Sequence, residues 1–215
     1  MKNDMTGPWW RALSSAAGIA ILLAAACGGS YSPPNQTATQ SSPQSQASGA
    51  VTEKPFAAGG TIDMQLGGGG YIVRAARDNV IRVTLGDNST AAVDISTQGA
   101  QSHVVVKDTS RQNFKATVEV PQAADLVIRL AAGELTIESI AGNKDVESNA
   151  GNVDVVTGDS QDYASVDASV QAGDIKAEAF GESRSGLFSK VSWTGKGKYT
   201  LRARLIAGNL TLRTK

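Results

Sequence analysis

The sequence Ala132-Gly133-Glu134-Leu135-Thr136-Ile137 is the first of four related copies of one short phrase. The other three are Ala150-Gly151-Asn152-Val153-Asp154-Val155, Ala172-Gly173-Asp174-Ile175-Lys176-Ala177 and Ala207-Gly208-Asn209-Leu210-Thr211-Leu212. In each copy a glycine, which can take a positive φ and turn the chain, precedes a polar residue and an alternation typical of a half-buried strand. Such a unit cannot bury its apolar face alone, so the copies are predicted to stack on one another.

The spacing of the repeats extends this prediction along the chain. The repeat glycines are 18, 22 and 35 residues apart, so the last gap is predicted to hold a degenerate copy around Ser185-Gly186-Leu187. In earlier segments, apolar and polar residues also alternate with a period of two, which is typical of strands. No segment after residue 27 has the pattern of an amphipathic helix. We therefore predict an all-β fold, a β-solenoid of the β-helix or β-roll type, with a sandwich-like start where the spacing is irregular. A β-sandwich throughout is the alternative.

The N-terminal segment has the features of an export signal. An apolar run over residues 12–26 is shorter than the roughly 20 residues that a membrane span needs. It ends in Leu23-Ala24-Ala25-Ala26-Cys27, which resembles the lipobox of bacterial lipoproteins. The resemblance implies cleavage before Cys27, a diacylglycerol on its sulfur and an acyl group such as palmitate on the new N-terminus. Several acyl chains anchor a protein firmly. The alternative is an ordinary secretory signal with an incidental cysteine.

Three segments are predicted. Residues 1–26 are a lipoprotein signal peptide, residues 27–55 are the lipidated cysteine and a tether, and residues 56–215 are the repeat-containing β-domain. The tether has no charged residue from Gly28 to Thr52 and is rich in Ser, Gln and Pro, a composition that cannot bury enough apolar surface to fold. The domain is thus expected at a cell membrane or outer membrane, lipid-anchored, on the periplasmic or extracellular side.

Few residues are candidates for catalysis or for binding a metal or cofactor. His103 is the single histidine and Cys27 the single cysteine, so we expect no metal site, no cofactor and no serine hydrolase, because each needs several such groups. The run Gly67–Gly70 lacks the residues of a phosphate loop and is predicted to be a strand bend or turn. Calcium binding is a weaker alternative, which would use Asp154, Asp159, Asp162 and Asp167.

Charge is balanced over the whole chain but segregated along it. Lys+Arg and Asp+Glu both total 20, which gives no general attraction to nucleic acid. Residues 134–182 hold 11 acidic and two basic residues, whereas residues 184–215 hold eight basic and no acidic ones. One interpretation is that the basic stretch forms the final coil and protects its open edge from aggregation. The other is that it binds an anionic partner, such as lipid headgroups, an acidic envelope polymer or an envelope protein, through Lys196, Lys198, Arg202 and Arg204.

The repeats also carry a family resemblance. Together with Val118-Glu119-Val120-Pro121 and Asp125-Leu126-Val127-Ile128-Arg129, they resemble the bacterial putative-adhesin domains, over about residues 56–215. The resemblance implies a β-solenoid-like domain on an exported protein and brings no catalytic residues. We predict a non-enzymatic adhesin-like binding or scaffolding module. The alternatives are an envelope-stress sensor or regulatory lipoprotein, and a carbohydrate-active β-helix enzyme.

Overall fold

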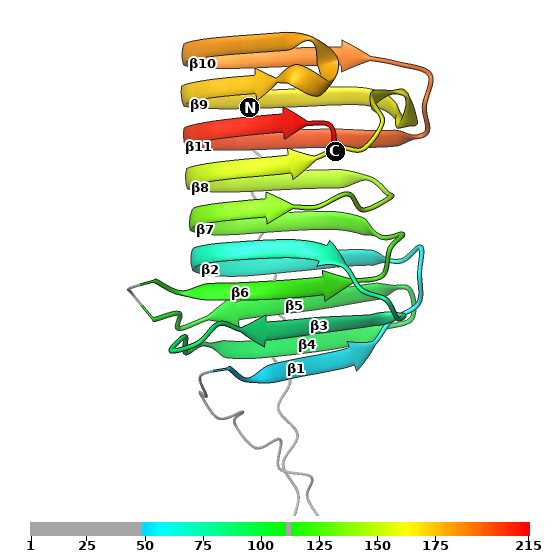
Figure 1. Ribbon diagram of the computed structural model, residues 1–215, viewed down its shortest axis with the longest axis vertical. Helices are drawn as coiled ribbons and strands as arrows, with labels where there is room; N and C mark the ends of the chain where they lie inside the picture. Colours follow the sequence, from blue (N-terminus) through cyan, green and yellow to red (C-terminus); the bar gives the residue numbers. More distant parts are fainter. Residues whose placement is uncertain (1–48, 111–112) are drawn as a thin grey trace, which may run out of the picture. The chain divides into compact units, whose positions relative to one another are not determined.

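The computed structural model describes residues 49–110 and 113–215, so Cys27 and most of the predicted tether lie outside the described residues. The described chain is all-β, as predicted, and its strands follow one another in a mixed sheet (Figure 1). The strands are β1 (Val51–Pro55), β2 (Thr61–Ala75), β3 (Val80–Leu85), β4 (Ala92–Gln98), β5 (Gln101–Lys107), β6 (Lys115–Val120), β7 (Asp125–Ile137), β8 (Lys144–Val156), β9 (Tyr163–Ala177), β10 (Glu182–Thr194) and β11 (Tyr199–Arg213). Two single-turn 3₁₀ helices, η1 (Ser160–Asp162) and η2 (Glu178–Phe180), precede β9 and β10.

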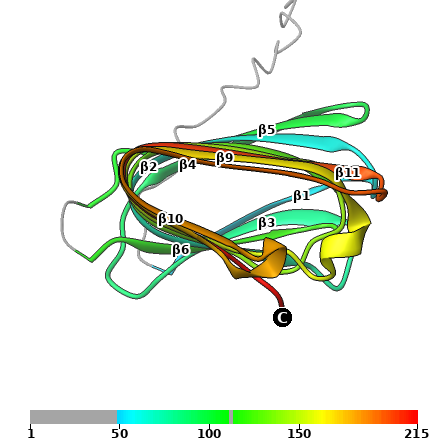
Figure 2. The same cartoon turned by 90° about the horizontal axis from the view of Figure 1, so that it is seen from above.

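Six long strands bend in the middle and contribute to two packed layers (Figure 2). The first half of β2 pairs with β5 and its second half pairs with β6. The first layer therefore contains β4, β5, the first halves of β2, β7, β8, β11 and β9, and the second half of β10. The second layer contains β1, β3, β6 and the remaining halves. The short strands of the first half of the chain each belong to one layer.

A column of glycines forms the bend. The repeat glycines lie beside one another across the strands, in the order Gly133, Gly151, Gly208 and Gly173. Their φ angles lie between +119° and +139°. A Cβ added at Gly151 would stand 1.8 Å from the carbonyl oxygen of Gly133. The repeat thus needs glycine for two reasons, namely the backbone conformation and the close approach of the strand beside it.

Two further glycines extend this column. Gly186 on β10 pairs with Gly173, which confirms the predicted degenerate copy. Gly69 pairs with Gly133 at the other end, so the run Gly67–Gly70 is a bend inside the continuous strand β2. The sequence pattern did not identify β2 as a repeat copy, because glycine replaces alanine before the bend.

The core lies between the two layers and is built from columns of aliphatic side chains. Successive strands place one buried residue in each column because side chains alternate between the two faces of a strand. One such column consists of Met64, Ile128, Val146, Ala203, Ala168 and Val191. Aromatic residues close one end of the interior, where Phe180 packs against Trp193 with ring centroids 5.0 Å apart.

The strand order differs from the order of the chain at one place. The strands follow the order β2-β7-β8-β11-β9-β10, so β11 lies between β8 and β9, and β10 is the terminal strand. The interpretation of the whole basic stretch as a protected final coil is therefore wrong for β11. Only Arg184 and Lys190 of that stretch lie on the terminal strand.

Candidate functional site: the outer face of the first layer

Two rows of outward side chains cross the first layer, and we call the surface that they form the outer face. In spatial order, its strands are β5, β2, β7, β8, β11, β9 and β10. Strand register places one residue of each strand in each row. The first row consists of His103, Asp63, Val127, Asp145, Arg202, Asp167 and Ser192. The second row consists of Val105, Gln65, Arg129, Glu147, Arg204, Ser169 and Lys190. The surface is rigid, because every row residue is held by a hydrogen-bonded strand.

The sign of the charge on the outer face alternates from strand to strand. Arg129 on β7 lies between Asp63 on β2 and Glu147 on β8, at 3.7 and 3.6 Å. Glu147 also meets a cation on its other side, where its Oε1 atom lies 2.7 Å from the Nη1 atom of Arg204 on β11. The carboxylates of Asp63 and Glu147 therefore each meet a cation from a neighbouring strand, which favours this pairing of strands.

The same alternation of charge reaches the terminal strand, because Lys190 on β10 lies 3.5 Å from Asp167 on β9.

A second chain of ion pairs crosses β1, β3, β6 and β2 in the second layer. Arg82 contacts Glu53 at 2.8 Å and Glu119 at 2.7 Å, and Arg74 contacts Glu119 at 2.9 Å. The hydrogen bond from Arg82 lowers the pKa of Glu119. Cross-strand ion pairs are thus a general feature of the outward surfaces.

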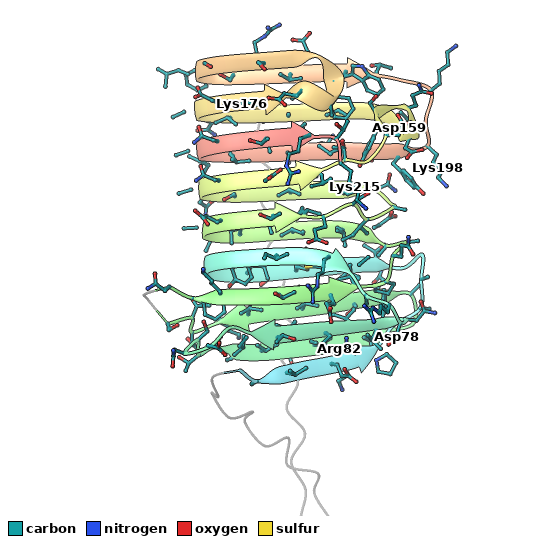
Figure 3. All side chains as sticks on the ribbon, viewed as in Figure 1. Asp78, Arg82, Asp159, Lys176, Lys198 and Lys215 are labelled. Carbon is teal, nitrogen blue, oxygen red and sulfur yellow. The ribbon has the colours of Figure 1, made fainter. Side chains whose placement is uncertain are left out.

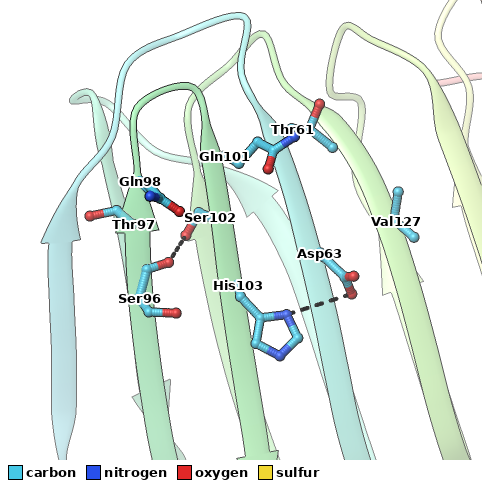
Figure 4. Close-up of a pocket in the computed structure, with 9 residues that line it drawn as sticks. All are labelled: Thr61, Asp63, Ser96, Thr97, Gln98, Gln101, Ser102, His103 and Val127. Atoms are coloured by element: carbon cyan, nitrogen blue, oxygen red, sulfur yellow. Dashed lines mark hydrogen bonds and ion pairs between the residues drawn. The ribbon is translucent and has the colours of Figure 1, made fainter.

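The outer face contains a recess between β2 and the β4–β5 hairpin (Figure 4). Its volume is about 690 Å³, and its lining is made almost wholly of polar side chains. The imidazole of His103 lies 3.9 Å from the carboxylate of Asp63. The lining residues are Thr61, Asp63, Ser96, Thr97, Gln98, Gln101, Ser102, His103 and Val127.

A second recess, of about 550 Å³, continues from the first toward β10. The two recesses share Thr61 and Val127, and the second also contacts Asp145, Arg202 and Asp167 of the first row. The two recesses therefore adjoin at Thr61 and Val127 and follow one another across the strands, and we call the pair the groove. The aspartates on either side of Val127, Asp63 and Asp145, are both partly exposed. Their Oδ1 atoms are buried and make no hydrogen bond within the described residues, although Oδ1 of Asp63 lies 3.7 Å from Nη1 of Arg129.

A buried lysine lies beneath the same end of the first layer. The Nζ atom of Lys144 donates to the carbonyl oxygens of Ile140 and Gly142, at 2.6 and 3.1 Å, and to the hydroxyl of Tyr163 at 3.1 Å. Burial lowers the pKa of Lys144 to about 8, while the charges of Asp125 and Asp162 act in the opposite direction. Burial also raises the pKa of Tyr163 above its usual value. All three donors are used inside the core, which gives this lysine a structural role.

The four basic residues predicted to bind an anionic partner lie in two places. Lys196 and Lys198 lie in the connection from β10 to β11, and Figure 3 shows Lys198 at the end of the strands. The Nζ atom of Lys198 lies 4.7 Å from the centroid of the Tyr199 ring. Arg202 and Arg204 lie on the outer face, where acidic strands flank them on both sides. Binding of an anionic partner stays a prediction, and in this arrangement Arg204 already has a carboxylate partner.

The alternative calcium ligands lie apart. Asp154 is on the second layer and pairs with Arg213 at 2.9 Å, whereas Asp167 is on the outer face. Asp159 accepts a hydrogen bond from the backbone of Gln161 at the start of η1. Within residues 49–110 and 113–215 no group of three or more His, Cys, Asp or Glu side chains is placed to hold a metal ion.

The recess offers several kinds of polar group to a ligand, namely hydroxyl, amide, imidazole and carboxylate groups. The imidazole of His103 and the carboxylate of Asp63 stand side by side there, 3.9 Å apart. Sequence reasoning missed this site, because its residues come from β2, β4, β5 and β7 and share no motif.

Comparisons with known proteins found similar solved structures but no relative by sequence. No family model matches the chain, and no curated protein is similar to it in sequence. A solved structure, named as a putative cell adhesion protein from Clostridium sporogenes, is 13% identical, with 77% of this chain and 99% of that chain covered and a TM-score of 0.49. Putative adhesins from Parabacteroides merdae and Bacteroides fragilis are 11% and 8% identical, with TM-scores of 0.26 and 0.23. The match to the Parabacteroides merdae protein covers 49% of this chain and 51% of that chain. The match to the Bacteroides fragilis protein covers 76% of this chain and 96% of that chain.

Proposed function

We propose that this chain is a lipid-anchored lipoprotein of the bacterial cell envelope that acts as a non-enzymatic, adhesin-like binding or scaffolding module on a β-solenoid-like stack. The observation that supports this proposal is the outer face, an extended polar surface to which β5, β2, β7, β8, β11, β9 and β10 all contribute. Stacked-strand proteins use such extended surfaces for recognition. No helix in the described residues is long and apolar enough to cross a membrane.

The predicted anchor can be tested separately from binding. Replacing Cys27 by serine removes the sulfur that would carry the lipid, so we expect Cys27→Ser to move the protein from the membrane fraction to the soluble fraction of its host. Mass spectrometry of the purified N-terminus should show the acyl groups in the unchanged protein. A membrane-bound Cys27→Ser protein without acyl groups in the parent would refute lipid anchoring.

Whole-cell crosslinking of the full-length lipoprotein tests the binding role. We expect recovery with surface glycans or external matrix, and a dominant membrane-protein partner would instead favour the sensor or regulatory alternative. A variant with Asp63→Ala and Arg129→Ala on the outer face should lose the crosslinked partner. A matched variant with Asp174→Ala and Lys176→Ala, on the outward side of the second layer, should retain it.

A further inference from the structure

We propose that the groove on the outer face binds a neutral, linear oligosaccharide, with its main contact in the recess between β2 and the β4–β5 hairpin. This inference rests on the proposed function as a binding module and names the class of its ligand. It depends on three properties of the groove, which are its lining, its charge and its direction.

The lining has the chemistry that sugar hydroxyls require. Ser96, Thr97, Gln98 and Gln101 bring hydroxyl and amide groups that both donate and accept hydrogen bonds. Asp63 adds a carboxylate acceptor. The volume of about 690 Å³ lies within the usual range of about 300–1,000 Å³ for small-molecule sites. A hydroxyl-rich ligand would satisfy these groups, whereas an apolar ligand would leave them without partners.

Val127 supplies the apolar floor of the groove. It is the one aliphatic residue in the first row, and it stands between Asp63 on β2 and Asp145 on β8. Strands two positions apart are about 9.6 Å apart, which leaves room for one sugar ring over the valine. The CH groups of the ring would contact Val127 while its hydroxyls reach the flanking carboxylates. The side chains of both aspartates are partly exposed, so each carboxylate can accept a hydrogen bond from a ligand hydroxyl.

The charge of the outer face favours a neutral ligand over an anionic one. Its two rows contain four carboxylates and four basic side chains, and the signs alternate between strands. An anionic polymer lying across the strands would meet a carboxylate as often as a cation. A neutral polymer meets no such repulsion and can accept or donate at every strand.

The direction of the groove favours a chain of sugars over a single one. The two recesses meet at Thr61 and Val127 and together extend from the β4–β5 hairpin to β10. A linear oligosaccharide that lies across the strands can use both recesses at once. We therefore expect affinity to rise with chain length, at least from a disaccharide to a tetrasaccharide.

The test is isothermal titration of the full-length lipoprotein in detergent micelles. The probes are neutral hexasaccharides of glucose, mannose, xylose and N-acetylglucosamine, with hexagalacturonate as the anionic comparison. We expect at least one neutral hexasaccharide to bind and hexagalacturonate to bind at least tenfold more weakly. No binding of any neutral probe, or preferential binding of hexagalacturonate that depends on Arg202 and Arg204, would overturn the proposal.

Two variants locate the binding site. Thr61→Trp fills the junction of the two recesses, and Asp63→Ala removes an acceptor, so each should weaken binding at least tenfold. The controls are Ser183→Trp on β10 and Asp174→Ala on β9, which alter outward positions of the second layer. Thermal unfolding of each variant should show that the fold is kept. Equal affinities for site and control variants would place the ligand elsewhere and refute the site.

The same experiment separates this inference from the proposed function. Failure of every neutral sugar, together with capture of a protein partner in whole cells, would refute the ligand class and leave the binding module intact. Chromatography of the sugars after titration should recover them unchanged. Shorter products would refute the non-enzymatic function itself, whatever the affinity.

Discussion

At the scale of single residues, the glycine column decides whether the long strands can bend and stack. Gly151 and Gly186 occupy equivalent positions, with φ angles of +119° and +109°, but they differ in their surroundings. A Cβ at Gly151 would overlap the backbone of Gly133, whereas a Cβ at Gly186 on the terminal strand would meet nothing within 4 Å. The pair therefore separates the cost of the backbone conformation from the cost of the close approach.

We predict that Gly151→Ala destabilises the fold by roughly 2–6 kcal/mol, the sum of backbone strain and overpacking. Gly186→Ala should cost only the strain, roughly 1–3 kcal/mol. Urea unfolding followed by tryptophan fluorescence can measure both, because Trp193 packs against Phe180 in the interior. Equal losses of stability in the two variants would show that the close approach of the strands costs nothing.

Lys144 predicts a dependence of stability on pH. Burial lowers its pKa to about 8 in the folded chain, below the usual lysine value of 10.5. The unfolded chain therefore binds more protons between these values, and stability rises with pH there. We expect the free energy of unfolding to gain about 2 kcal/mol from this residue between pH 8 and pH 10. Tyr71 and Tyr163, whose pKa values burial raises, act in the opposite direction above about pH 10.

The variant Lys144→Met provides the measurement. It replaces the amine by an apolar group of similar length, so the gain in stability between pH 8 and pH 10 should disappear. Unfolding in urea at several pH values would give the slope for each protein. Parallel slopes for the two proteins would contradict a lowered pKa for this lysine.

At the scale of elements, charge favours the position of β11. The strand carries Arg202 and Arg204 and lies between β8 and β9, whose facing outward residues include Asp145, Glu147 and Asp167. The acidic and basic stretches that are separate in the sequence thus interleave in the sheet. Placement of β9 directly beside β8 would bring like charges together, which is unfavourable across a strand pair.

We predict a small but measurable coupling between Arg204 and Glu147. The pair is about half exposed, so its coupling energy should be roughly 0.2–1 kcal/mol at low salt and should shrink in 1 M NaCl as screening increases. A double-mutant cycle with Arg204→Ala and Glu147→Ala would measure it, with Thr211→Ala as an outward control on the same strand. A coupling that is zero at low salt would remove this contribution to strand order.

At the scale of the whole molecule, the terminal strand β10 decides whether the stack ends. Glu182 and Arg184 occupy inward positions of this strand, where apolar residues would continue two columns of the core. Their side chains form an ion pair, with Nη2 of Arg184 3.0 Å from Oε2 of Glu182. Inward charges of this kind oppose the pairing of a further strand. The edge protection expected from the basic stretch is therefore supplied on β10 by an ion pair.

We predict that replacing both charges by valine makes the protein self-associate. Glu182→Val and Arg184→Val together would extend the apolar columns to the open end of the sheet, so a concentration-dependent dimer or larger species should appear in sedimentation velocity. The matched control is Ser183→Val with Ser185→Val, which alters outward positions of the same strand. A monomeric inward variant, or equal association of the control, would show that these charges do not guard the edge.

The sequence by itself determined the strands, the glycine bends and the aliphatic columns, because these depend on local alternation and on the conformational freedom of glycine at positions such as Gly133 and Gly151. It also identified the degenerate copy at Gly186. The tertiary structure alone decided that β11 lies between β8 and β9, and it alone brought Asp63, His103 and Val127 together on one face. Strand order and the outer face depend on contacts between residues that are far apart in the chain, and neither periodicity nor spacing contains that information.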